Sequence, residues 1–75
     1  MAFTFDVEKE FGTIGKQSAD GMQKSLNLVS WNGKKAKYDI RPWDESKGRC
    51  GKGITFTKDE MVELKEILNK INFDE

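Results

Sequence analysis

Alternating apolar and polar residues predict strands over most of the chain before Thr57. The first strand, at residues 3–16, mixes apolar with charged residues and includes Gly12 and Gly15. We therefore expect it to bend or bulge at a glycine. Further strands are expected at residues 22–31, 35–43 and 54–56, separated by the Asp20-Gly21 step, a hairpin and a loop at residues 44–53.

Two local signals refine this strand order. Asn32-Gly33 is a strong hairpin signal, because both residues tolerate the positive φ that tight hairpin turns require. Pro42 has no amide hydrogen to donate, so the strand ladder should weaken there or the strand should lie at a sheet edge.

The last part of the chain predicts one amphipathic helix. Thr57 and Glu60 have the spacing of a capping box, and Asp59 also suits the positive end of the helix dipole. We expect the helix to end near Asn72. One apolar stripe follows at helical spacing, made of Met61, Leu64, Ile67, Leu68 and Ile71.

Strand alternation assigns side chains to the two faces of the predicted sheet. The apolar face, which we expect to receive the helix stripe, carries Leu26, Leu28, Tyr38, Ile40, Ile54 and Phe56. The opposite face is expected to be open. It carries Trp31 and Trp43 beside Lys24, Lys34, Lys37 and Arg41.

Length and composition narrow the possible functions. With 75 residues we expect one domain spanning residues 1–75, whose small core favours support from a second copy. A single cysteine, Cys50, and the absence of histidine argue against a disulfide, a zinc site and an enzyme, so we expect no cofactor and no small-molecule substrate. No apolar run reaches the roughly 20 residues of a membrane span, and Met1 opens no signal peptide, so a cytoplasmic location is expected.

Charge is unevenly distributed, although the net charge is zero. Residues 12–43 carry six basic and two acidic side chains, whereas residues 59–75 carry two basic and six acidic ones. If these regions occupy different faces, the molecule has a basic face and an acidic back.

Tryptophans among cations on an open sheet face are typical of single-stranded nucleic-acid binding, in which bases stack on the rings and phosphates follow the cations. The same rings are also compatible with packing, and the lysines with a solvated hairpin. A protein-interaction module and a single-stranded RNA binder therefore stay open as alternatives.

Three motifs and the helix that follows them resemble one family. The motifs are Trp31-Asn32-Gly33-Lys34, Tyr38-Asp39-Ile40-Arg41-Pro42-Trp43 and Gly51-Lys52-Gly53-Ile54-Thr55-Phe56. Over about residues 24–71 the chain resembles the positive cofactor four family of transcriptional coactivators, which bind single-stranded DNA. In particular it is similar to the small bacterial YdbC-type branch.

The resemblance implies an α+β fold, with a curved four-stranded antiparallel sheet followed by one C-terminal helix, and a homodimer formed through the helices and sheet margins. Together with the face assignment, it gives the residues expected to bind nucleic acid as Lys16, Lys24, Asn27, Val29, Trp31, Asn32, Lys34, Lys37, Arg41, Trp43 and Lys52. The expected dimer interface comprises Met61, Leu64, Leu68 and Ile71.

The chain departs from the family pattern in places. The hairpin has one extra residue around Lys35 to Lys37, and Pro42 replaces an acidic residue. The amino end is longer and acidic, and a serine-rich regulatory tail is absent. These departures bear on the hairpin register and on a coactivator role.

Overall fold

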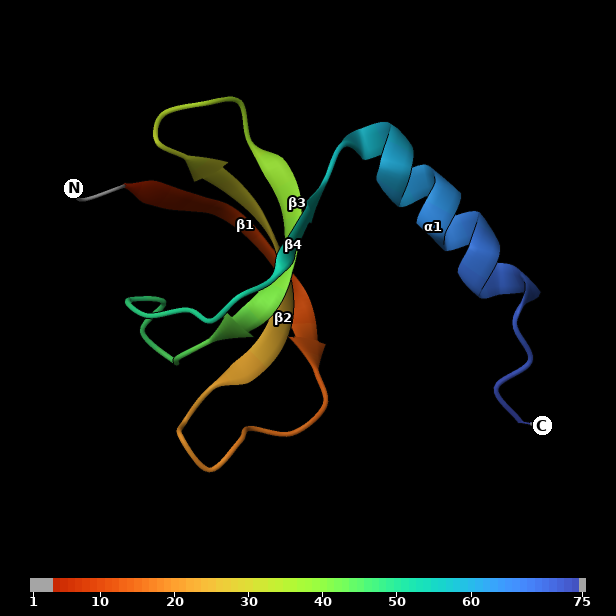
Figure 1. Cartoon of the computed structure of the whole chain (residues 1–75), viewed down its shortest axis with the longest axis horizontal. Coiled ribbons are helices and arrows are strands. Elements are labelled where there is room, and N and C mark those ends of the chain that lie inside the picture. The colour runs from red at the N-terminus through yellow and green to blue at the C-terminus, as the bar shows by residue number, and fades with distance from the viewer. Residues whose placement is uncertain (1–3, 75) are drawn as a thin grey trace.

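A computed structural model describes residues 4–74 and contains four strands and one helix (Figure 1). In chain order they are β1 (Phe5–Ile14), β2 (Gln23–Trp31), β3 (Lys37–Trp43), β4 (Ile54–Phe56) and α1 (Lys58–Lys70). The strands form one antiparallel sheet in the order β1-β2-β3-β4. The predicted fold class is confirmed, while the expected strand start at Phe3 lies outside the described residues.

The predicted turn is present, but the hairpin around it is wider than expected. Asn32 and Gly33 have φ values of 53° and 74°, and the Lys34 amide donates to the Trp31 carbonyl at 3.0 Å. Pairing of β2 with β3 nevertheless resumes only at Val29 and Lys37, so the expected strand start at residue 35 is wrong. The reason is that the last residues of β2 pair with β1 and not with β3, with Trp31 opposite Phe5.

The sheet is strongly bent toward one face. β1 has register irregularities between Val7 and Lys9 and between Glu10 and Gly12, so the expected bulge at a glycine is confirmed and a second one is added. Trp43 pairs with the first residue of β2 and Trp31 is the last, yet their ring centroids lie 6.1 Å apart. A straight strand would separate these ends by roughly 26 Å. We call this side the concave face; it carries Phe5, Val7, Ser25, Asn27, Val29, Trp31, Asp39, Arg41 and Trp43.

The buried residues lie mainly on the concave face. Val29 and Trp43 are 0% and 2% exposed, and Asp39 is 0% exposed. The outer face carries Leu26, Leu28, Tyr38, Ile40, Ile54 and Phe56, none of which is fully buried. The expectation that this apolar face receives the helix stripe is therefore met only in part within a single chain, where Ile54, Leu68 and Ile71 stay exposed. The sheet bends away from that side, and among the described strands α1 contacts β3 and β4 alone.

Helix α1 begins with the predicted capping box. The Thr57 hydroxyl accepts from the Glu60 amide at 3.2 Å, and the Glu60 carboxylate accepts from the Thr57 amide at 2.8 Å. The helix ends at Lys70, two residues before the expected Asn72, and it lies to one side of the sheet (Figure 1). Within residues 4–74 no helix is long and apolar enough to span a bilayer.

The segment before β4 lies against β3 because it contains glycines. A Cβ on Gly53 would lie 2.2 Å from the Arg41 Cβ, and one on Gly51 would lie 2.8 Å from the Pro42 Cγ. The pairing of β3 with β4 ends at Ile40, before Pro42, which agrees with the expected weakening of the ladder. The glycines thus let this loop reach the strand that carries Arg41.

Candidate functional site

Three aromatic rings meet on the concave face. Trp31 stacks on Trp43 with an interplanar angle of 19°, and the Phe5 ring contacts both at centroid distances of 5.4 Å and 5.2 Å. They come from β1, β2 and β3, so the bend of the sheet builds the cluster. The prediction that the two tryptophans share a face is confirmed.

Arg41 lies beside this cluster and is held by Asp39. Its Nε donates to both carboxylate oxygens of Asp39, at 2.7 Å and 2.8 Å, and its Nη2 lies 2.6 Å from Oδ2. The guanidinium carbon is 4.5 Å from the centroid of the Trp31 ring, which is a cation–π contact. Ring and cation therefore form one assembly on neighbouring strands.

A buried polar pair supports the second tryptophan. In the orientation that satisfies its neighbours, the Asn27 amide oxygen accepts from Trp43 Nε1 at 3.3 Å and from Ser25 Oγ at 2.9 Å. Asn27 is 1% exposed and Ser25 is 3% exposed, so these hydrogen bonds are shielded from water. The indole of Trp43 is thus fixed at its edge.

Burial changes the expected roles of several concave-face residues. Trp31 is half-buried, which leaves part of its ring accessible. The expectation that Trp43 is exposed is wrong, because the curled sheet and Phe5 cover it. Val29, at 0% exposed, and Asn27 likewise offer almost no surface, and their assignment to nucleic-acid binding stays a prediction.

The expected cations divide into two groups at opposite ends of β2. Lys34 and Lys37 line a hollow of about 700 Å³ with Lys58 from the start of the helix. Lys16 and Lys24 line another, of about 410 Å³. Lys52 and Asn32 are also exposed, the former in the loop before β4 and the latter in the hairpin turn.

One of these lysines lies on the other side of the sheet from its expected place. Lys24 pairs with Pro42 in the alternation that also pairs Leu26 with Ile40, so it belongs to the outer face. Its expected position beside the tryptophans is wrong, since strand alternation separates it from Ser25 and Asn27.

Sequence reasoning missed two residues of this site. The predicted first strand includes Phe5, but the pairing of Phe5 opposite Trp31 depends on the register of β1. Asp39 has no predicted role, although a carboxylate two residues before an arginine on a strand predicts that the two side chains share one face. That spacing was the available signal.

Two aspartates organise the loops that flank the site. Partial burial acts to raise the pKa of Asp44, but hydrogen bonds from the Arg49 amide, the Ser46 hydroxyl and the Gly48 amide outweigh it and lower the pKa. A hydrogen bond from the Ser18 hydroxyl, and then one from the Met22 amide, lowers the pKa of Asp20. Both carboxylates thus stabilise their turns by accepting these hydrogen bonds in the ionised form.

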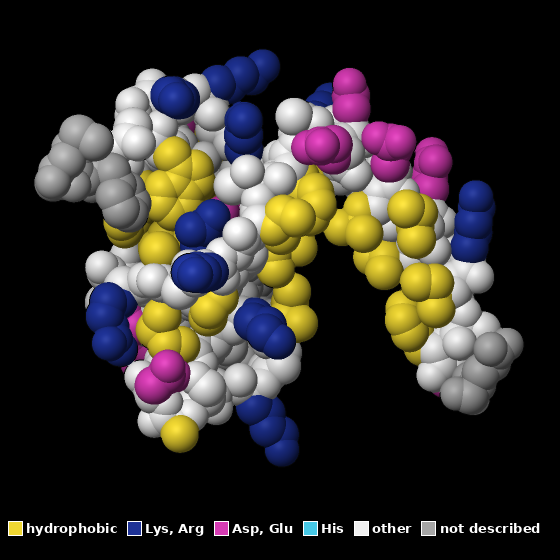
Figure 2. Space-filling model, in the orientation of Figure 1, with side chains coloured by type: hydrophobic (Ala, Val, Ile, Leu, Met, Phe, Trp, Pro, Cys, Tyr) yellow, Lys and Arg dark blue, Asp and Glu magenta, His cyan; other side chains and the backbone are white. Residues whose placement is uncertain are grey.

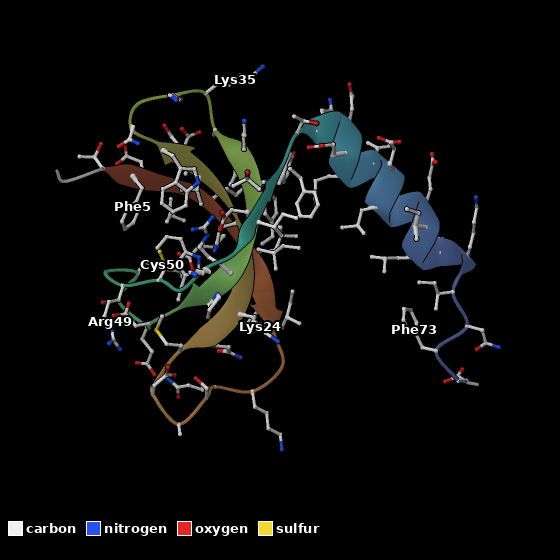
Figure 3. All side chains as sticks on the ribbon, in the orientation of Figure 1. Phe5, Lys24, Lys35, Arg49, Cys50 and Phe73 are labelled. Carbon is white, nitrogen blue, oxygen red and sulfur yellow. The ribbon has the colours of Figure 1, made fainter. Side chains whose placement is uncertain are left out.

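The surface separates charge and apolar character. Acidic side chains follow the outer side of the helix, and Lys and Arg cluster over the sheet (Figure 2). Figure 3 shows Lys35 at the tip of the β2–β3 loop and Phe73 beyond the end of the helix, away from the sheet. The expected basic and acidic sides are present.

Apolar side chains of the helix and the sheet face one another across an open space (Figure 2). Met61 and Leu64 are half-buried, whereas Leu68 and Ile71 are 45% and 46% exposed. Met61, Leu64 and Leu68 line a groove of about 440 Å³ together with Tyr38 of β3. The stripe is therefore only partly covered in one chain.

Comparison with known proteins gives two matches. The family described as Transcriptional Coactivator p15 (PC4) matches residues 18–67. A protein of Treponema pallidum (strain Nichols), described as uncharacterized, is 40% identical over 72 residues, which cover 96% of this chain and 84% of that protein. The family match includes Trp31, Asp39, Arg41, Trp43 and Lys52.

Proposed function

The chain belongs to the Transcriptional Coactivator p15 (PC4) family, and on that premise we propose that it binds single-stranded DNA with little base preference. The observation that carries the proposal is the assembly of Arg41, Trp31 and Trp43 on the concave face. The family is a nucleic-acid-binding, non-enzymatic one. A role in transcription, replication or repair fits such binding.

In the proposed complex, bases stack on the accessible part of Trp31, and Trp43 supports that ring from behind. Phosphates contact exposed lysines at the margin of the concave face, namely Lys37, which pairs opposite Val29, Lys34 in the adjoining hairpin and Lys52 in the loop before β4. The helix carries four of the 13 acidic residues, Asp59, Glu60, Glu63 and Glu66, and these take no part in the contacts. Assignment to the YdbC-type branch rests on the resemblance of the motifs.

We also propose a homodimer formed through α1 and the outer face. Support comes from the partly covered stripe, since Val62 and Ile67 are 49% and 55% exposed in addition to the predicted interface residues. Exposed apolar surfaces of this kind mark association sites. A second copy supplies the same stripe by symmetry.

A titration that follows tryptophan fluorescence tests the function. We expect saturable binding of oligo-dT, weaker binding of the matched duplex, and a decrease of log affinity with log salt steeper than about −2, at roughly −0.7 per phosphate neutralised. Lys34→Ala should make this slope shallower, whereas Lys70→Ala in the helix serves as the matched control and should not change it.

The other outcomes separate the alternatives. Tighter binding of oligo-U than of oligo-dT would favour RNA as the ligand. An affinity that does not depend on salt, or no fluorescence change with any of the three, would contradict the proposal and favour a protein partner.

A further inference from the structure

The ion pair between Asp39 and Arg41 is largely enclosed. Asp39 is 0% exposed and the Arg41 side chain 16% exposed. The two residues lie two positions apart on β3, so both side chains point into the concave face. Burial of a carboxylate costs free energy unless a cation is paired with it, so the buried Asp39 requires Arg41 beside it.

Arg41 uses different parts of its guanidinium for its two contacts. Its Nε and Nη2 are bonded to Asp39, while its central carbon lies over the Trp31 ring, 4.5 Å from the centroid. Trp31 in turn stacks on Trp43. The carboxylate therefore holds the guanidinium in place, and the guanidinium packs against the indole.

We propose that Asp39 is a positioning residue for the ligand: it holds Arg41 against Trp31 and so orients the ring on which bases stack. This inference rests on the proposed function. It also changes the expected role of Arg41 from a phosphate contact to a support for the ring. Because its charge is balanced by Asp39, Arg41 contributes little to the release of counterions.

The alternative is that Arg41 turns outward to a phosphate when the ligand binds. That movement would break the bonds of Nε and Nη2 and leave the Asp39 carboxylate buried without its cation. The exposed Lys34, Lys37 and Lys52 offer phosphate contacts without this cost.

Asp39→Asn tests the positioning role, with Asp6→Asn on the exposed part of β1 as the matched control. We expect Asp39→Asn to weaken oligo-dT binding roughly tenfold, which is within the range for one aromatic–base stack. The near-ultraviolet circular dichroism of the free protein should change as well, because the indole environment is altered. Asp6→Asn should resemble the wild type in both measurements.

The double variant Asp39→Asn/Arg41→Gln removes both charges together and keeps the test valid if a single variant fails to fold. We expect it to bind more weakly than the wild type with an unchanged salt slope. A slope shallower by about 0.7 for each lost contact would show that Arg41 binds a phosphate and would overturn the proposal.

The two proposals fail in different ways. If wild-type protein does not bind oligo-dT, the proposed function is wrong. If the wild type binds and Asp39→Asn binds equally well, or if its near-ultraviolet spectrum is unchanged, the positioning role alone is wrong.

Discussion

The indole of Trp31 has neighbours on several sides, and they determine what its removal costs. Phe5, Trp43 and Arg41 all contact it, so the ring contributes to the packing of the concave face as well as to the proposed site. Affinity and stability are therefore coupled at this residue, and a variant here needs both measurements.

We expect Trp31→Ala to weaken oligo-dT binding by about 1–3 kcal/mol, the usual loss for one aromatic–base stack. The free energy of unfolding should also fall, because the half-buried ring leaves a gap beside Phe5. Urea unfolding and titration of the folded variant separate these effects. Trp31→Phe retains a ring and should recover much of the affinity; an affinity for Trp31→Ala equal to that of the wild type would remove this residue from the site.

At the scale of elements, prediction from sequence succeeds where the determinants are local. The capping box specifies the start of α1 through two residues only three positions apart, Thr57 and Glu60. Strand alternation likewise places Trp31 and Trp43 on one face. It fails where distant segments decide. The bulge in β1 is predictable from its glycines, but the burial of Trp43 beneath Phe5 depends on a residue from another strand, and no pattern within β3 indicates it.

The capping box predicts a measurable contribution to stability. Thr57→Ala removes the acceptor for the Glu60 amide and should lower the free energy of unfolding by about 0.5–2 kcal/mol. Urea denaturation followed by circular dichroism at 222 nm, a general helix signal, measures the loss. Lys58→Ala leaves both capping hydrogen bonds in place and is the control; an equal loss there would rule out the cap as the cause.

The loop after β3 should respond to acid through Asp44. Because its pKa is lowered from the ordinary 3.8 in the folded protein, the carboxylate stabilises the loop above that value, and the stabilisation is lost as the pH falls through the folded pKa. The amide resonances of Gly48 and Arg49, whose N–H groups donate to Asp44 at 2.9 Å and 3.2 Å, should titrate with a midpoint below 3.8. Asp44→Asn should abolish this titration, and a midpoint above 3.8 would contradict the assignment.

At the scale of the whole molecule, the separation between helix and sheet is the dominant feature. The longest and shortest extents of the chain are 44 Å and 19 Å, and the apolar sides of α1 and the outer face point toward one another. One chain leaves this space partly open, and a second copy of the stripe is the simplest way to fill it.

We expect sedimentation equilibrium to show a dimer at micromolar concentration. Leu68→Glu places a charge in the stripe at a position that is 45% exposed and should shift the protein to monomer, because burial of an unpaired carboxylate opposes association. Lys70→Glu introduces the same carboxylate outside the stripe and should leave the dimer intact. Wild-type monomer under these conditions would contradict the proposed assembly.

The exposed helix stripe has a thermodynamic consequence if the dimer is the folded form. A reaction that joins two chains obeys mass action, so the population of folded protein rises with concentration and its midpoint of melting rises with it. The stability of this chain is then defined only together with its abundance. Dilution alone would act on it as a denaturant does.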